Sequence, residues 1–236
     1  MHVLVTRPYE QALETRKKLL DIDCCVSIEP VLDIEKIQYS SDIYKNSNGF
    51  IVTSVHAAKE IAKQTYLDRN ISVFAVGYAT AKPLKDAGFT NIYEAYGDAK
   101  NLLQLIKNKR GTDEGLLTYL SGWHITQDIA RVLAMDGYDA QRVVCYKATP
   151  KKKLNNDIVQ LIKKDKIHAV VFYSYRTAYF FNQLIENEKI NSSLKNMVAL
   201  TMSEYVASAL NNSDWEGVIF TKQPSQDSLI SEIVAL

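Results

Sequence analysis

Hydroxyl side chains recur where predicted strands run into predicted helices. A buried strand at 50–52 is followed by Thr53 and Ser54, and one at 169–173 is followed by Ser174, in segments that read almost alike. Open α/β sheets bind ligands beyond the carboxyl ends of their strands. Helix N-termini at that edge carry unpaired amide donors and a positive dipole end, which favour carboxylates or phosphates. The pattern predicts one ligand, held in a cleft between two similar domains.

The candidate binding residues share this position between a strand and a helix, and they combine small hydroxyls and glycines with two arginines. They are Arg7, Thr53, Ser54, Gly77, Thr80, Ser121, Gly122, Ser174, Arg176 and Ser203. Each serine or threonine has an ordinary alternative role, because these residues are preferred N-caps of helices. The arginines have one too, as surface ion-pair partners. Recurrence in both halves favours the binding role.

Tyr146 is the candidate catalytic residue. It lies in the extended run 142–148, near the apparent junction of the two halves. A phenol can donate a hydrogen bond or a proton to a leaving oxygen. A strand tyrosine can equally be an ordinary packing residue, so the sequence leaves both roles open.

Strands alternate with helices along the whole chain, which predicts doubly wound, mostly parallel α/β sheets with helices on both faces. About ten strands are expected, more than one small sheet normally carries, so two domains are favoured. Thr80 is expected to cap a helix that has Pro83 in its first turn and ends at Gly88. A later helix face is expected to begin at Ile125 and to close at Gly137.

The composition excludes several classes of protein. The 236 residues carry a net charge of +1, without the basic excess that a nucleic-acid partner would usually demand. No apolar run approaches the length of a membrane span, and the N-terminus reads as a strand entering a helix rather than a signal peptide. The sequence therefore predicts a cytoplasmic protein that binds a small molecule and neither nucleic acid nor membrane.

The sequence also lacks the motifs that carry cofactors. No strand is followed by Gly-x-Gly-x-x-Gly, no P-loop or Gly-x-Ser-x-Gly elbow exists, and the four histidines are scattered. The three cysteines give neither a disulfide framework nor metal-ligand spacing, although the adjacent Cys24 and Cys25 could be redox-active. We expect no metal and no cofactor.

Several short motifs, in order along nearly the whole chain, resemble those of the uroporphyrinogen-III synthase family. They are 3–8, 30–32, 50–54 with Ala57, 75–81 with Gly88, 119–122 with Leu133 and Gly137, 144–146, 172–174, and 203–204 with Ala207. The chain departs from the family pattern at two points. No basic residue follows soon after Gly122, and the Gly-Pro frequent near positions 201–202 is absent.

The resemblance implies two α/β domains joined by a two-stranded ladder, with the active site in the cleft between them. The first domain would be discontinuous, comprising 1–33 plus 151–236, and the second would comprise 38–140. The ladder would pair 30–37 with 141–150, in agreement with their extended character.

The resemblance further implies a lyase of tetrapyrrole (haem) biosynthesis. It would cyclise hydroxymethylbilane to uroporphyrinogen III with inversion of ring D, loss of water and a spiro intermediate, without a cofactor. Tyr146 would then assist departure of the terminal hydroxyl. An alternative is a two-lobed protein that binds a small anion or a tetrapyrrole without catalysis, and another is a regulatory domain that has lost activity. A monomer is expected, since no long exposed apolar heptad or edge is evident.

Overall fold

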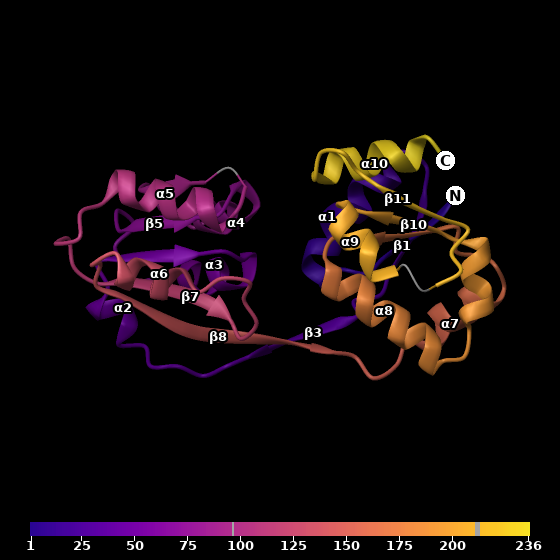
Figure 1. The fold of residues 1–236 in the computed structure, drawn as a ribbon, viewed down its shortest axis with the longest axis horizontal. Coiled ribbons are helices and arrows are strands. Elements are labelled where there is room, and N and C mark those ends of the chain that lie inside the picture. Colours follow the sequence, from indigo (N-terminus) through magenta and orange to yellow (C-terminus); the bar gives the residue numbers. More distant parts are fainter. Residues whose placement is uncertain (96, 211–212) are drawn as a thin grey trace. The chain divides into compact units, whose positions relative to one another are not determined.

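The computed structural model describes residues 1–95, 97–210 and 213–236, which divide into two compact units. Unit 1 comprises Met1–Asp33 and Thr149–Leu236, and unit 2 comprises Ile34–Ala148. Each unit alternates strands with helices around its own sheet (Figure 1). The chain therefore has the α/β architecture that its sequence predicts.

Unit 1 is built on five strands in the order β11-β10-β9-β1-β2, and its neighbouring strands pair in parallel. The strands are β1 (His2–Val5), β2 (Cys25–Ile28), β9 (Ala169–Phe172), β10 (Val198–Thr201) and β11 (Gly217–Phe220). The helices are α1 (Tyr9–Leu20), α7 (Asn156–Lys163), α8 (Tyr175–Asn187), α9 (Glu204–Ala207) and α10 (Gln226–Val234), with the 3-10 turns η1 (Asn191–Asn196) and η2 (Ser208–Leu210). Because strand side chains alternate, Leu4 packs with α7 and α8, whereas Val3 and Val5 pack with α1 and α10.

Unit 2 is built on a sheet of order β3-β8-β7-β4-β5-β6. The strands are β3 (Leu32–Lys36), β4 (Gly49–Val52), β5 (Ser72–Ala75), β6 (Ile92–Glu94), β7 (Leu117–Gly122) and β8 (Ala140–Pro150). The helices are α2 (Ile43–Asn46), α3 (Val55–Ala62), α4 (Tyr78–Asp86), α5 (Ala99–Lys109) and α6 (Ile129–Met135). Phe50 and Val52 pack with α3 and α4, and Ile51 packs with α5 and α6. Helices thus cover both faces of this sheet too.

The two sheets share one strand arrangement. The run β6-β5-β4-β7-β8 of unit 2 corresponds to β11-β10-β9-β1-β2 of unit 1. In both units the central strand, β4 or β9, leads into a helix through a serine cap with nearly the same backbone angles. Ser54 has φ −145° and ψ 150°, and Ser174 has φ −149° and ψ 152°. The repeat seen in the sequence is therefore a repeat of structure.

Strands β3 and β8 pair with each other. The amide of Ile37 donates to the carbonyl of Cys145 at 3.0 Å, and the amide of Lys151 donates to the carbonyl of Val31 at 3.0 Å. From the first bond to the second, the residue number falls from 37 to 31 in one strand and rises from 145 to 151 in the other. The two strands therefore run antiparallel. The segments that pass from one unit to the other thus form a ladder.

The prediction that Thr80 caps its helix is wrong. Helix α4 begins at Tyr78 with Gly77 as its cap, so Pro83 lies inside the helix rather than in its first turn. The amides of Thr80 and Ala81 donate to the Gly77 carbonyl at 3.1 and 3.0 Å, which closes the first turn there. Thr80 is consequently a buried residue of the helix, while Gly88, at φ +85°, follows its end as predicted.

The predicted boundary after β7 is also wrong. Ser121 and Gly122 are the last residues of this strand, because pairing with β8 continues through Gly122 and Tyr146. Helix α6 starts only at Ile129, capped by Asp128, so Ile125 lies in the connection. Strand β6 was not predicted at all, since three residues are too short to show a periodicity.

Candidate functional site

A hollow of about 430 Å³ opens in unit 2, beyond the carboxyl ends of β4, β5 and β7 and beside the middle of β8. Four of the predicted site residues line it: Thr53, Ser54, Gly122 and Tyr146. Thr53 and Ser54 follow β4, Gly122 ends β7, and Tyr146 lies within β8 at the position that pairs with Gly122. The parallel pairing of β4, β7 and β8 brings these residues together. This hollow is the candidate functional site of unit 2.

Gly122 and Tyr146 occupy paired positions at the rim of the hollow. The register of β7 against β8 shifts between Ser121 and Gly122, so that Gly122 faces Tyr146. A Cβ atom at Gly122 would lie 2.7 Å from Cζ and 2.9 Å from the phenolic oxygen of Tyr146. Only a glycine leaves this space, and the shift in register sets the phenol against it.

His56 contacts Tyr146 from the first turn of α3. The two ring centroids are 5.2 Å apart with an interplanar angle of 50°. His56 was not among the predicted site residues, because the sequence shows it only as one of four scattered histidines. Its place two residues after Ser54, at the same strand end, was the available signal.

Thr53 is hydrogen-bonded to a second tyrosine, Tyr119, which was not among the predicted site residues. The Thr53 hydroxyl and the Tyr119 hydroxyl are hydrogen-bonded at 2.9 Å. Burial raises the pKa of Tyr119, although the hydrogen bond to Thr53 lowers it in part, so the phenol is neutral at pH 7. A tyrosine inside a buried strand needs a partner for its hydroxyl, and that requirement was the signal.

Ser54 caps α3 by accepting a hydrogen bond from the Ala57 amide at 3.2 Å.

Ser121 is fully buried, and its hydroxyl accepts from Nε of Arg142 at 2.9 Å. The same guanidinium donates to the carbonyls of Gly122 and Trp123 at 2.9 and 3.0 Å. Ser121 and Arg142 thus hold the end of β7 in place. Ser121, Gly77 and Thr80 are not among the described residues that line the hollow.

Arg7 lies at the corresponding edge of unit 1, two residues after the end of β1. Its guanidinium carbon is 4.0 Å from the centroid of the Tyr173 ring. It donates to the amide oxygens of Gln226 and Gln11 at 3.2 and 3.0 Å, and its Nε is buried without a hydrogen-bond partner. Burial lowers the pKa of Arg7, but a guanidinium remains charged at neutral pH. Amide oxygens leave this charge available to an anion.

Ser174 and Ser203 both cap helices in unit 1. Their hydroxyls accept from the amides of Thr177 and Val206, each at 3.3 Å. The Ser174 hydroxyl is also hydrogen-bonded to the Thr177 hydroxyl at 2.8 Å. Because a hydroxyl has one donor and two acceptor positions, each serine keeps capacity for a ligand contact. Because β1, β9 and β10 are adjacent and parallel, these serines share one sheet edge with Arg7. Arg176, in the first turn of α8, lies 5.8 Å from the Phe180 ring centroid.

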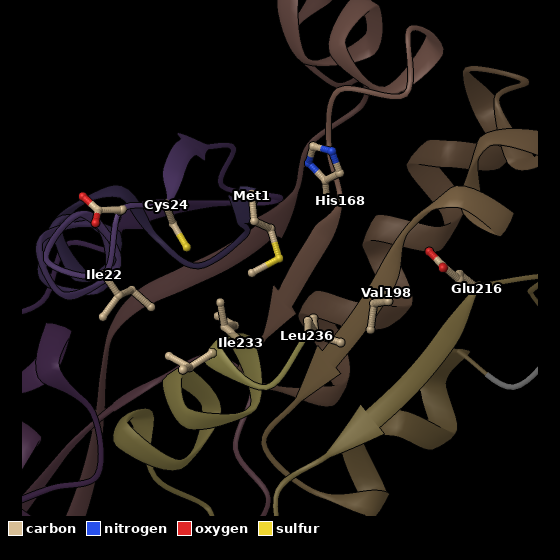
Figure 2. A pocket seen from close by; sticks show the side chains of 10 residues that line it. Met1, Ile22, Cys24, His168, Val198, Glu216, Ile233 and Leu236 are labelled. Atoms are coloured by element: carbon tan, nitrogen blue, oxygen red, sulfur yellow. The ribbon is translucent and has the colours of Figure 1, made fainter.

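A larger hollow of about 620 Å³ lies at the opposite edge of the unit 1 sheet (Figure 2). Its lining residues include Met1, Cys24, His168, Val198 and Glu216, which stand at or just before the amino ends of the five strands. It contains none of the predicted site residues. Parallel α/β sheets bind ligands at the carboxyl ends of their strands, and we therefore place the candidate site at the other edge despite the greater volume here.

Two matching parallel α/β units with polar groups at the carboxyl ends of their strands define the class of α/β proteins that bind ligands beyond those ends. Within the described ranges, no group of three or more His, Cys, Asp or Glu side chains converges as a metal site requires. Among the helices of those ranges, none combines the length and apolar character needed to cross a membrane.

Comparison with known proteins identifies the family. The family model described as "Uroporphyrinogen-III synthase HemD" matches residues 14–231. The chain belongs to the uroporphyrinogen-III synthase family, and it is an enzyme of the lyase class in porphyrin and haem biosynthesis.

Two solved structures are similar to this chain. Uroporphyrinogen-III synthetase from Helicobacter pylori has 17% identity and a TM-score of 0.66, over 100% of this chain and 99% of its own. A mutant uroporphyrinogen III synthase from the extremely thermophilic bacterium Thermus thermophilus has 18% identity and a TM-score of 0.57, over 100% and 98%. At these identities the likeness shows the fold. A search of curated proteins finds no match.

Proposed function

We propose that Tyr146 is the proton donor with which this enzyme releases water from hydroxymethylbilane on the way to uroporphyrinogen III. The observation that carries the proposal is the position of the phenol, set against Gly122 in a hollow beyond the strand ends of unit 2. Thr53 and Ser54 line the same hollow and supply hydroxyls around the departing oxygen.

The first chemical step breaks the bond between the terminal carbon and its hydroxyl. The Tyr146 hydroxyl gives a proton to the leaving oxygen and water departs. The pyrrole N–H releases its proton to solvent, which leaves an azafulvene, and the Tyr146 phenolate regains a proton from solvent. Attack on this carbon by the already substituted position of ring D forms a spiro intermediate, which fragments and recloses with the ring inverted. A phenol has a pKa near 10 and is a weak acid at pH 7, so its contribution is modest.

Product choice depends on how the substrate is held, since the linear tetrapyrrole also cyclises spontaneously to the uninverted isomer. The eight carboxylates of the substrate meet a chain with a net charge of only +1. We therefore assign their binding to Arg7 and to helix N-termini, such as those capped by Ser54 and Ser174. Holding the linear tetrapyrrole in one geometry favours the reaction that leads to isomer III by proximity and orientation.

Gly77, Arg176 and Ser203 remain proposed contacts at these edges. Thr80 and Ser121 are buried, and we assign them a supporting role in α4 and β7.

We also propose that 1–33 plus 151–236 and 38–140 act as two domains connected by the ladder of 30–37 and 141–150. The near-neutral charge supports the absence of a nucleic-acid partner. We also propose that the protein is a cytoplasmic monomer.

The test is to incubate the purified protein with freshly made hydroxymethylbilane, oxidise the product and separate the uroporphyrin isomers. We expect isomer III to predominate. The alternative, a tetrapyrrole-binding protein without catalysis, predicts isomer I at the rate seen without protein. That outcome would overturn the assignment of catalysis to Tyr146.

A further inference from the structure

Three tyrosines of unit 1 form a continuous stack. Tyr175 and Tyr179 lie one turn apart on α8, with ring centroids 6.2 Å apart and an interplanar angle of 12°. Tyr205, the second residue of α9, stacks on Tyr175 at 5.0 Å and 23°. These values lie in the range of favourable offset stacking. Tyr175 is thus the middle member, and Tyr179 and Tyr205 are the two ends.

The two ends of the stack differ. Tyr179 meets the edge of Phe180 at 5.2 Å and 75°, and its hydroxyl accepts a hydrogen bond from Gln183 at 2.9 Å. Tyr205 is 70% exposed. Exposure of a large aromatic ring to water costs free energy. The Tyr205 ring is oriented by Tyr175, which in turn stacks on Tyr179. The result is a rigid aromatic face, presented to solvent by Tyr205.

The position of the stack connects it with the proposed substrate contacts. Tyr175 directly follows Ser174, and Tyr205 lies two residues after Ser203. Because β9 and β10 are adjacent parallel strands, the stack lies at the carboxyl edge of the sheet, where Arg7 also lies. An aromatic face and cationic groups therefore occur together on one edge of unit 1.

We infer that Tyr205, backed by Tyr175 and Tyr179, is a stacking subsite for one pyrrole ring of the tetrapyrrole. This inference rests on the proposed function. A pyrrole is a flat aromatic ring, which fits an exposed aromatic face, and its carboxylate side chains extend from the ring edge, toward groups such as Arg176. The backing rings hold Tyr205 in its bound orientation before the substrate arrives, which lowers the entropic cost of binding.

The inference is tested by titrating the full-length protein with uroporphyrin III, the oxidised product, and following the Soret band. We expect a red shift with loss of intensity on binding. Tyr205→Leu weakens the affinity about three- to tenfold, and Tyr205→Phe retains it, because stacking needs the ring and not the hydroxyl. Tyr66→Leu is the matched control, since Tyr66 is a 60% exposed tyrosine of unit 2. It leaves the affinity unchanged.

A kinetic readout separates the subsite from a structural role. In Tyr205→Leu the KM for hydroxymethylbilane rises by a similar factor while kcat and the melting temperature stay at the parent values. Parent-like uroporphyrin affinity and KM in Tyr205→Leu would overturn the inference. So would a parent dimer that dissociates in this variant while tetrapyrrole binding is unchanged, because the stack would then join two copies of the chain.

Failure of the proposed function gives a different result. If the parent forms only isomer I but binds uroporphyrin III in a Tyr205-dependent way, the subsite stands and catalysis falls. If the parent forms isomer III and the affinity does not depend on Tyr205, catalysis stands and the subsite falls.

Discussion

The two units share one strand order and differ in what stands at the carboxyl edge of each sheet. Unit 2 has a hollow whose lining includes the hydroxyl residues Thr53 and Ser54 and the acidic residue Asp98, with the Tyr146 phenol at its rim. Unit 1 presents the Arg7 guanidinium and the exposed ring of Tyr205. The comparison teaches that the repeat supplies the frame, the serine caps included, while the side chains around it differ. We propose that this difference places proton donation in unit 2, whereas both units contribute to binding.

Each unit has a tyrosine near this edge, buried in unit 2 and partly buried in unit 1, and the two make different contacts. In unit 2 the Tyr119 hydroxyl meets Thr53 within the lining of the hollow. In unit 1 the Tyr173 hydroxyl meets Thr15 at 3.2 Å, and its ring carries Arg7. Burial raises the pKa of each phenol. Tyr119 therefore positions the Thr53 hydroxyl in unit 2, and Tyr173 positions the Arg7 guanidinium in unit 1.

The largest effect is expected from Gly122→Ala, which perturbs unit 2 at the rim of its hollow. The new methyl group would meet the Tyr146 ring at 2.7 Å, so the phenol or the strand must move. We expect isomer III formation to fall at least about tenfold and the free energy of unfolding to fall by about 1–3 kcal/mol. Initial rates and urea unfolding measure the two effects.

The matched control is Gly217→Ala in β11 of unit 1, where an added Cβ has nothing within 4 Å. Parent-like activity is expected there. Full activity in Gly122→Ala would show that the close approach of Gly122 to Tyr146 has no role in the reaction.

Arg7→Gln examines the binding role of unit 1 and is expected to raise KM about tenfold with little change in kcat. The substitution also removes two hydrogen bonds and a cation–π contact of a partly buried guanidinium, so we expect a small fall in melting temperature, and KM is compared at a temperature at which both proteins are folded. Arg131→Gln, at an exposed position of unit 2, serves as the control and should leave KM unchanged. A fall in kcat at constant KM would instead place Arg7 in the chemistry and break the distinction between the units.

The smallest effect concerns the pH dependence of the free energy of unfolding at alkaline pH. Burial raises the pKa of the Cys145 thiol to about 12, whereas a free thiol titrates near 8.5. The folded state favours the neutral thiol, so its contribution to stability is complete below pH 8.5 and is lost as pH rises toward 12. Each such group changes the free energy of unfolding by up to about 1.4 kcal/mol per pH unit.

Urea unfolding at pH 8 and pH 10 checks this expectation. Cys145→Ala should flatten the pH dependence, and Cys25→Ala, at an exposed thiol of unit 1, should leave it as in the parent. Equal slopes in the parent and in Cys145→Ala would contradict the assignment.

The sequence predicted best what is encoded locally. Ser54 and Ser174 cap their helices as the strand–serine–helix pattern indicates, and Gly88 follows a helix end because it adopts positive φ. The extension of β7 through Gly122 was missed, because it depends on pairing with β8 rather than on local propensity. His56 entered the site only through its contact with Tyr146, which links residues far apart in the chain. Such contacts leave no periodicity in the sequence.

The central claim is that Tyr146 in unit 2 supplies the proton for loss of water, and the Tyr146→Phe variant tests it most directly. Phenylalanine keeps the ring against Gly122 and removes only the hydroxyl. We predict a fall of about tenfold in kcat for isomer III formation, the modest value expected of a weak acid, at unchanged KM. A rate within about twofold of the parent would contradict the claim, because a general acid contributes more than that.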